Sequence, residues 1–146
     1  MNNLSKKTLQ INLTGGAEEI AHLASAIEQF CERENLGDMV KNQVNLILEE
    51  LYTNTANYGF EGIDDGQVKI SLSVIDHQLE ICFEDNGIAF NPLDISDPDL
   101  MLSLDDRPIG GLGVFFVKTL TEHVEYHRVG DFNQIKMIKS LLPKDS

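Results

Sequence analysis

Hydrophobic residues recur at helical spacing over two stretches of the chain. Between Ala17 and Glu34 the apolar positions follow a period of about 3.6 residues, which predicts a helix that Asn35-Leu36-Gly37 ends. A second apolar stripe predicts an amphipathic helix with Asp38 as its N-cap and Gly59 as its stop. That stripe consists of Val40, Val44, Ile47, Leu48, Leu51, Thr55 and Tyr58.

Elsewhere apolar residues alternate with polar ones, which predicts strands. Asp76-His77 would turn one hairpin and Gly130-Asp131-Phe132-Asn133 another. Because tight turns rather than crossover helices join the strand pairs, we expect an α+β fold: a two-layer α/β sandwich with helices on one face of a mixed, mostly antiparallel sheet. The alternating positions are Leu9, Ile11 and Leu13; Val68, Ile70, Leu72 and Val74; Leu79, Ile81 and Phe83; Val124 and Tyr126; and Ile135, Met137 and Leu141.

A long stretch without periodicity separates the two hairpins. It runs from about residue 86 to 109, and a loop of this length inside a domain is typical of a lid or an unstructured segment. It closes with Arg107 and, directly after residue 109, the cluster Gly110-Gly111-Leu112-Gly113, before an apolar run that predicts a buried helix. Glycines ahead of a helix let its free N–H groups approach an anion closely, although a glycine cluster alone is also typical of a turn.

Length and charge narrow the possible ligands. The 146 residues fit one domain, residues 1–146. Acidic residues outnumber basic ones by 24 to 11, which gives a formal net charge of −13 and argues against direct binding of nucleic acid. An anionic metabolite would need a local source of positive charge, either helix-start N–H groups or a divalent cation.

Several features indicate a soluble, cytoplasmic protein. Cys31 and Cys82 lie in apolar runs rather than at metal-ligand spacing, which suits buried thiols in a reducing compartment. The first residues lack an apolar signal-peptide core, and no segment approaches the roughly 18 apolar residues of a membrane helix. His22 falls on the polar face of its helix, so we expect it at the surface.

Three polar residues border the apolar stripe of the second predicted helix. Glu50, Asn54 and Asn57 share one edge of the stripe, whereas Glu49 points away from it. They could be ordinary surface residues or part of a site. The alternation of the third strand places Asp85 on the same face as its apolar residues, so this acid either points toward the core or caps the following turn.

The order of these motifs resembles the three nucleotide-binding boxes of the GHKL (Bergerat-fold) ATPase superfamily. The matching motifs are E50-x-x-x-N54, D85-x-G87-x-A89-F90 and G110-G-L-G113. Within that superfamily the chain is most similar to the stand-alone anti-sigma-factor serine kinases, since histidine kinases carry an asparagine where Glu50 stands. Tyr58 occupies a position where many relatives have histidine, and the turn near Asn133 matches the last box only loosely.

The resemblance implies ATP and Mg²⁺ as cofactors. Asp85 would accept a hydrogen bond from the adenine amino group, Asn54 would ligate Mg²⁺, and Glu50 would be the catalytic base. The glycine amides would contact the phosphates. The implied nucleotide-binding residues are Asn54, Asn57, Asp85, Gly87, Ala89, Phe90, Arg107, Gly110, Gly111, Leu112, Gly113 and Val114.

The resemblance also implies a function in gene regulation. We expect an anti-sigma-type serine kinase that phosphorylates a STAS-type anti-sigma-factor antagonist and binds a sigma factor, with a homodimer as a further expectation. Alternatives are a non-catalytic, nucleotide-gated binding module and a detached histidine-kinase-type ATPase domain. A globular domain whose motifs coincide by chance is the remaining one.

Overall fold

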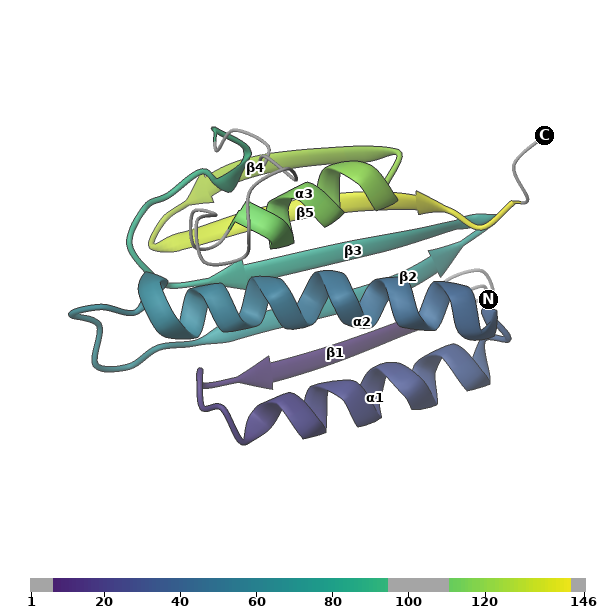
Figure 1. Ribbon diagram of the computed structural model, residues 1–146, viewed down its shortest axis with the longest axis horizontal. Helices are drawn as coiled ribbons and strands as arrows, with labels where there is room; N and C mark the ends of the chain where they lie inside the picture. Colours follow the sequence, from purple (N-terminus) through teal and green to yellow (C-terminus); the bar gives the residue numbers. More distant parts are fainter. Residues whose placement is uncertain (1–6, 95–110, 143–146) are drawn as a thin grey trace, which may run out of the picture.

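The computed structural model describes residues 7–94 and 111–142, with the backbone alone at residues 7 and 111–113. One strand and two helices come first, followed by two hairpins with a third helix between them, as Figure 1 shows. In chain order they are β1 (Lys7–Leu13), α1 (Glu19–Arg33), α2 (Gly37–Asn54), η2 (Thr55–Gly59), β2 (Val68–Ile75), β3 (Gln78–Asp85), η3 (Pro92–Asp94), α3 (Gly111–Leu120), β4 (His123–Val129) and β5 (Phe132–Ser140).

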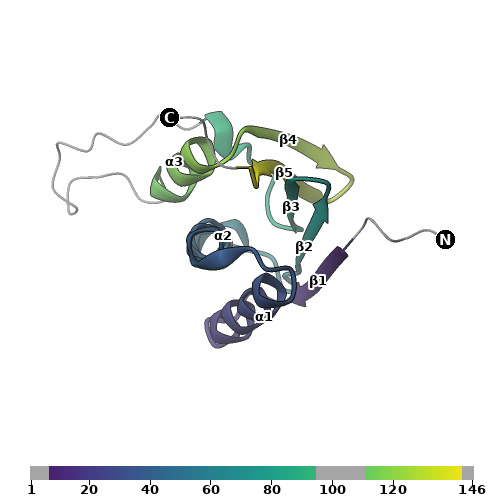
Figure 2. The same ribbon diagram turned by 90° about the vertical axis from the view of Figure 1, so that its right-hand side faces the viewer.

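The strands form one sheet in the order β1-β2-β3-β5-β4. Each neighbouring pair in this sheet is antiparallel. Figure 2 shows α1, α2 and α3 together on one side of the sheet. The expected two-layer α/β sandwich is therefore confirmed, and its described strands are all antiparallel rather than mixed.

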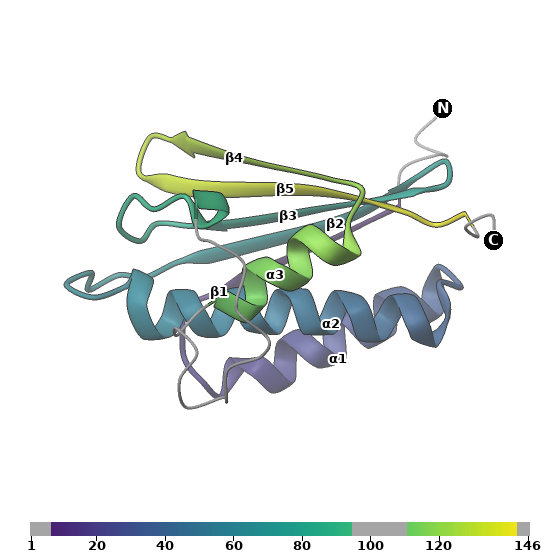
Figure 3. The same cartoon turned by 45° about the horizontal axis from the view of Figure 1, so that its top comes forward.

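Helix α2 lies between α1 and α3 over the sheet (Figure 3). Its predicted apolar stripe is buried at Val44, Ile47, Leu48 and Leu51, and Tyr52 is buried beside it. These side chains pack with the inward-facing positions of β2, β3 and β5 into one core. This packing holds α2 in one position over the sheet, next to the strand ends that carry the polar residues described below.

A cluster around Glu19 fixes the start of α1. Glu19 Oε1 accepts hydrogen bonds from the Thr14 amide (2.8 Å), the Thr14 hydroxyl (2.7 Å) and the Gly16 amide (3.2 Å), and lies 3.1 Å from the Tyr52 hydroxyl. Burial opposes ionisation of Glu19, but these hydrogen bonds outweigh it and lower the pKa of the carboxyl. Burial, together with the Glu19 carboxylate, raises the pKa of Tyr52 to about 12, so its hydroxyl stays protonated.

We expect Glu19→Gln to lower the free energy of unfolding by about 1 kcal/mol at pH 7, because an amide accepts fewer and weaker bonds from the β1–α1 turn. The folded pKa of Glu19 is lowered, so its stabilisation is complete above the ordinary pKa of glutamate and is lost as the pH falls through the folded value. Urea unfolding between pH 3 and 7 should show the difference shrinking at the acid end. Glu18→Gln, an exposed neighbour, is the matched control.

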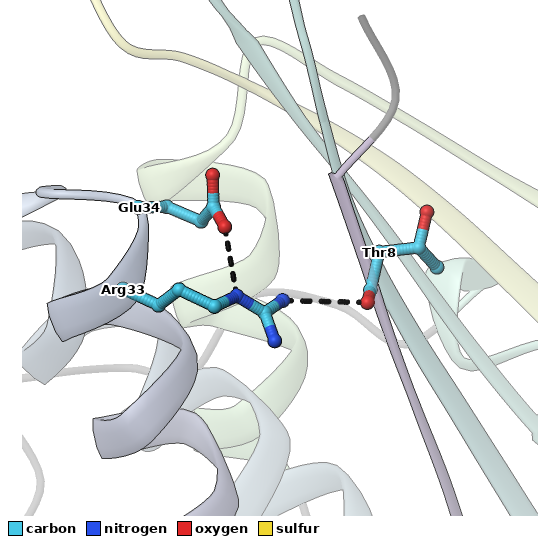
Figure 4. Close-up of polar contacts among 3 residues, drawn as sticks. All are labelled: Thr8, Arg33 and Glu34. Atoms are coloured by element: carbon cyan, nitrogen blue, oxygen red, sulfur yellow. Dashed lines mark hydrogen bonds and ion pairs between the residues drawn. The ribbon is translucent and has the colours of Figure 1, made fainter. Parts of the chain in front are cut away.

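The opposite end of α1 is tied to the edge strand. Arg33 Nη2 donates to the carbonyl oxygen of Thr8 in β1 (3.4 Å), while its Nε pairs with Glu34 Oε2 at 2.9 Å (Figure 4). The guanidinium also lies 5.2 Å from the centre of the Phe30 ring. Both ends of α1 are thus joined to β1 or to the turn that follows it.

Local details differ from the predicted boundaries of α2 and β5. Helix α2 begins at Gly37, and Asp38 is not its N-cap but pairs with Lys41 at 3.5 Å inside the first turn. The turn between β4 and β5 is only Gly130-Asp131, with Gly130 at φ 59°, so Asn133 belongs to β5. Leu141 follows that strand.

Helix α3 is amphipathic rather than buried all round. Val114 and Val117 are buried, whereas Lys118 and Thr119 are exposed. Sequence alone over-predicted its burial because a helix at the border of a two-layer fold has only one layer to pack against.

Candidate functional site

A cavity of about 380 Å³ opens between the end of α2, the ends of β3 and β5, and the segment 88–92. A volume of this size is typical of small-molecule sites. Most of its wall is apolar, with a few polar groups near Asp85. The lining residues are Leu51, Asn54, Thr55, Tyr58, Gly59, Glu61, Phe83, Asp85, Ile88, Phe90, Pro92, Val114, Asn133 and Ile135.

Asp85 is the buried acid of this cavity, only 7% exposed at the end of β3. Its Oδ1 accepts hydrogen bonds from the Gly87 amide (2.9 Å) and from Asn133 Nδ2 (3.0 Å). Burial raises the pKa of the carboxyl, partly offset by these two bonds, by the charge of Arg128 and by a hydrogen bond from the Thr55 side chain. Asp85 therefore faces the core side and also caps the turn, so both interpretations of its position hold.

Sequence reasoning missed two polar partners of Asp85, Asn133 and Thr55, and the Tyr126 hydroxyl that bonds to Asn133. Asn133 is 5% exposed and lies directly opposite Asp85 in the β3–β5 ladder. Tyr126 Oη donates to Asn133 Oδ1 at 2.6 Å. Thr55, which the helical wheel assigned to the core stripe, lines the cavity. The signal for Asn133 was the alternation Asn133-Ile135-Met137, which places it on the buried face once β5 is started one residue before it.

Gly87 lies where two backbone segments meet. A Cβ at this position would lie 2.5 Å from the carbonyl oxygen of Gly59 and 2.9 Å from Asp85 Oδ1. The Ile88 amide donates to that same Gly59 oxygen (3.0 Å), and Arg128 Nη1 donates to the Gly87 oxygen (2.9 Å). Only glycine allows the chain after β3 to pass this closely under the end of α2.

Gly87→Ala should therefore lower the free energy of unfolding by about 1–3 kcal/mol, because the new methyl group collides with backbone that cannot move aside. Denaturant unfolding measures the effect. Gly59→Ala is the matched control, since a Cβ there meets only the Thr55 side chain, 3.4 Å away, and that glycine has no positive φ. Equal losses in both variants would contradict the steric explanation.

The end of α2 changes form just after Asn54. Residues Thr55–Gly59 make a π-helical turn, with the Phe60 amide bonding to the Thr55 oxygen. This wider turn rotates the side chains that follow, so Tyr58 leaves the predicted core stripe, is 46% exposed and lines the cavity. A period of 3.6 residues carried through to Gly59 could not foresee this.

The predicted binding residues of α2 are distributed unevenly. Asn54 lines the cavity. Glu50 is half-buried one turn earlier and is not among the lining residues, whereas Glu49 is exposed, as the helical wheel predicted. Asn57 is exposed and does not line the cavity, so the structure does not bring it to the site.

The later predicted residues fall partly outside the described chain. Phe90 lines the cavity and Ala89 is exposed without lining it. Arg107, Gly110 and most of the predicted lid (residues 95–109) lie outside the described residues. Gly111, Leu112 and Gly113 form the first turn of α3 rather than preceding it, and Val114, the next residue, lines the cavity. N–H groups in a first helical turn have no partner within the helix, so their availability to an anion is unchanged.

Residues 14–139 match the histidine kinase-like ATPase domain family. The chain belongs to this family. The resemblance to GHKL-type ATPases, and among them to anti-sigma-factor serine kinases, is confirmed.

The curated relatives of this ATPase domain are named as serine kinases and anti-sigma factors. Serine-protein kinase RsbW of Listeria monocytogenes is 27% identical over 93 residues, which cover 58% of this chain and 56% of the relative. The chain thus matches little more than half the length of that protein. Serine/threonine-protein kinase BtrW of Bordetella bronchiseptica is 21% identical over 141 residues, 97% of this chain and 99% of the relative. Anti-sigma F factor of Clostridium beijerinckii is 24% identical over 122 residues, 84% of this chain and 85% of the relative.

Solved structures show the same fold. The RsbU and RsbW domains of Rv1364c from Mycobacterium tuberculosis match 92% of this chain and 32% of that chain, with a TM-score of 0.66 and 9% identity. The histidine kinase domain of the Erythrobacter litoralis EL346 blue-light activated kinase matches 88% of this chain and 62% of that chain, with a TM-score of 0.53 and 19% identity.

The donor groups of this ATPase domain fit a magnesium ion that arrives together with phosphate. Asn54 is among the residues that line the cavity, and Glu50 lies one turn before it on the same helix. In the part of the chain that the structure describes, no group of three or more His, Cys, Asp or Glu side chains could hold a metal by itself. Magnesium typically takes only one or two protein oxygens and completes its shell with phosphate and water.

The thiols of the ATPase domain are not candidate nucleophiles. Burial raises the pKa of Cys31, and raises that of Cys82 to about 11, so neither is a thiolate near neutral pH. Cys31 is buried and Cys82 half-buried.

Within residues 7–94 and 111–142, none of the helices has the length and apolar character needed to span a membrane.

Proposed function

We propose that this chain binds Mg·ATP in the cavity beside Asp85 and transfers the γ-phosphoryl group to a serine of a partner protein. The observation that carries the proposal is a buried acid at the base of a largely apolar cavity, with Asn54 and the first turn of α3 at its margin. Family membership supports the same assignment.

The apolar wall and Asp85 suit an adenine ring. The faces of the ring would contact apolar lining residues, which include Leu51, Phe83, Ile88 and Ile135. Asp85 can accept a hydrogen bond from the exocyclic amino group of adenine, and guanine has a carbonyl at the corresponding position. A site that presents a buried acceptor discriminates strongly against a ligand that lacks the donor.

The margin of the cavity suits the phosphates. The N–H groups in the first turn of α3 have no partner within the helix, and their partial positive charge stabilises an anion at the helix start. When bound, magnesium would neutralise phosphate charge, with Asn54 as its protein ligand. The helix-start N–H groups and the magnesium ion would supply the local positive charge that an anionic ligand needs on a protein with a net charge of −13.

Glu50 would serve as the base for the transfer step. Its carboxylate would accept the serine hydroxyl proton while the serine oxygen forms a bond to the γ-phosphorus and the bond to the β-phosphate oxygen breaks, leaving phosphoserine and ADP. Phosphoryl transfer depends mainly on positioning and charge stabilisation, so a carboxylate is a sufficient proton acceptor.

The partner class follows from the relatives. We infer that the substrate is a STAS-type anti-sigma-factor antagonist and that the chain also binds a sigma factor, because relatives carry the names serine-protein kinase RsbW and anti-sigma F factor. One observation favours a second candidate, a nucleotide-gated binding module without catalysis: Glu50 is not among the residues lining the cavity.

Incubation with labelled ATP, magnesium and a candidate antagonist tests the proposal. We expect a phosphate label on serine, stable to acid. A label that is lost in acid would indicate phosphohistidine and the histidine-kinase alternative. Nucleotide-dependent binding of the antagonist without any label would support the binding module instead, and absence of ATP binding would overturn both.

A further inference from the structure

The Asn133 side chain connects the end of β3, the segment 88–90 and β4 beside the cavity. Its Nδ2 donates to Asp85 Oδ1 (3.0 Å) and to the Ile88 oxygen (2.8 Å). Its Oδ1 accepts from the Phe90 amide (3.1 Å) and from the Tyr126 hydroxyl (2.6 Å). An asparagine amide has two donor hydrogens and two acceptor lone pairs, so these bonds use its full capacity.

The four bonds also fix which way round the amide lies. A flipped amide would aim its NH₂ group at the Phe90 N–H, which can only donate, and its oxygen at two acceptors, Asp85 Oδ1 and the Ile88 carbonyl. Asn133 therefore presents a donor to Asp85 in one orientation only. At 5% exposure, water does not compete freely for these positions.

This arrangement determines what Asp85 can offer a ligand. Oδ1 already accepts from the Gly87 amide and from Asn133 Nδ2, and the Thr55 side chain also donates a hydrogen bond to this carboxyl group. Each carboxylate oxygen has about two lone-pair directions, so a ligand donor has to be met by Oδ2. Without the Asn133 bond, only the Gly87 amide and the Thr55 side chain would hold the carboxylate against rotation about χ2, which is a soft torsion.

We propose that Asn133 is the positioning residue that sets base selectivity in this pocket. It holds Oδ1 of Asp85 and so keeps Oδ2 as a fixed acceptor for an exocyclic amino group. Its bonds to the Ile88 oxygen and the Phe90 amide also fix these two lining residues beside Asp85. The inference rests on the proposed nucleotide function and adds to it a residue that need not touch the ligand.

The test compares ATP and GTP affinities by titration calorimetry in wild type and in Asn133→Leu, a substitution of similar size. We expect the ratio of ATP to GTP affinity to fall by about ten- to a hundredfold, the effect of losing an ordered bond to a charged acceptor. A purely structural role would lower both affinities together or change neither, leaving the ratio unaltered.

Tyr126→Phe is the matched control. It removes one of the four bonds of Asn133 and leaves the Phe90 amide to keep the side chain oriented, so the bond to Asp85 persists. We expect it to keep the ATP preference of wild type. A loss of preference equal to that of Asn133→Leu would contradict the assignment to the Asp85 contact.

Asn133→Asp keeps the inference testable if the leucine variant does not fold. Two carboxyl groups with oxygens about 3 Å apart share one proton, which can replace the lost donor until rising pH removes it. Besides Asp85, the titratable or charged side chains near position 133 are Tyr126 and Arg128 of β4. Between pH 6 and 9 we expect the ATP preference of this variant to fall relative to wild type as the pH rises, and parallel profiles would overturn the inference. A wild-type protein that binds neither nucleotide would refute the proposed function itself.

Discussion

Glu50→Gln is expected to slow phosphoryl transfer by about 10²- to 10⁴-fold while leaving the affinity for ATP within a few-fold of wild type. Glutamine keeps the size of the side chain but cannot take the serine proton. Glu50 lies outside the cavity lining, so the substitution removes little contact with the nucleotide. Transfer rates with labelled ATP and a nucleotide titration on the same preparation measure the two effects separately.

The neighbouring residue supplies the control for this experiment. Glu49→Gln removes the same charge from the next position of α2, on its exposed side. We expect it to transfer phosphate at the wild-type rate. Unchanged turnover in Glu50→Gln would leave the nucleotide-gated binding module as the better interpretation, and equal losses in both variants would point to the total charge of the helix rather than to one carboxylate.

Asp85→Asn is expected to lower ATP affinity by about a hundredfold and to remove the preference for ATP over GTP. The carbonyl oxygen of the new amide would take the bonds from Gly87 and Asn133, so its NH₂ group would face the ligand in place of an acceptor. That group repels the amino group of adenine but can donate to the carbonyl of guanine. Competition between the two nucleotides at fixed magnesium measures the change.

Glu84→Gln is the control for that substitution. Glu84 precedes Asp85 on β3 and points to the other face of the sheet, where its Oε2 lies 3.3 Å from Gln134 Nε2. Removing its charge should leave nucleotide selectivity unchanged. If Glu84→Gln reduced ATP affinity as strongly, the effect would be a general one of charge.

Stability should respond to Asp85→Asn in the opposite sense to binding. Burial raises the pKa of Asp85 in the folded state, so the ionised carboxyl costs stability as the pH rises from its ordinary pKa through the higher folded value. Neutralising it is therefore expected to leave the protein at least as stable as wild type at pH 7. Such a pairing of lost binding with kept stability is characteristic of a functional residue.

Most of the architecture could be predicted from local pattern. Burial of Val44, Ile47, Leu48 and Leu51 followed from helical period, and the strands followed from alternation. Both periodicities arise from the chain geometry of single elements, so neighbouring residues contain the information. The exposure of Glu49 beside the half-buried Glu50 was predictable for the same reason.

The predictions failed where two elements meet. The π-helical turn exposed Tyr58, which an uninterrupted helix would have buried. Asn133 was assigned to a turn, although it is a buried partner of Asp85. The π-helical turn could not be found locally, because it depends on the fit of the α2 terminus over β3. Alternation along β5 could have placed Asn133 on the buried face, but its pairing with Asp85 depends on the register between strands almost fifty residues apart in sequence.

The sequence by itself determined the two-layer fold, the acid at the end of β3 and the polar edge of α2, since each depends on periodicities within one segment. Only the tertiary structure decided that Asp85, Asn54, Tyr58 and Asn133 line one cavity and that Asn57 does not. Packing of α2 on the sheet sets the distances between these side chains. A side chain acquires a role in a site only through neighbours that are remote along the chain.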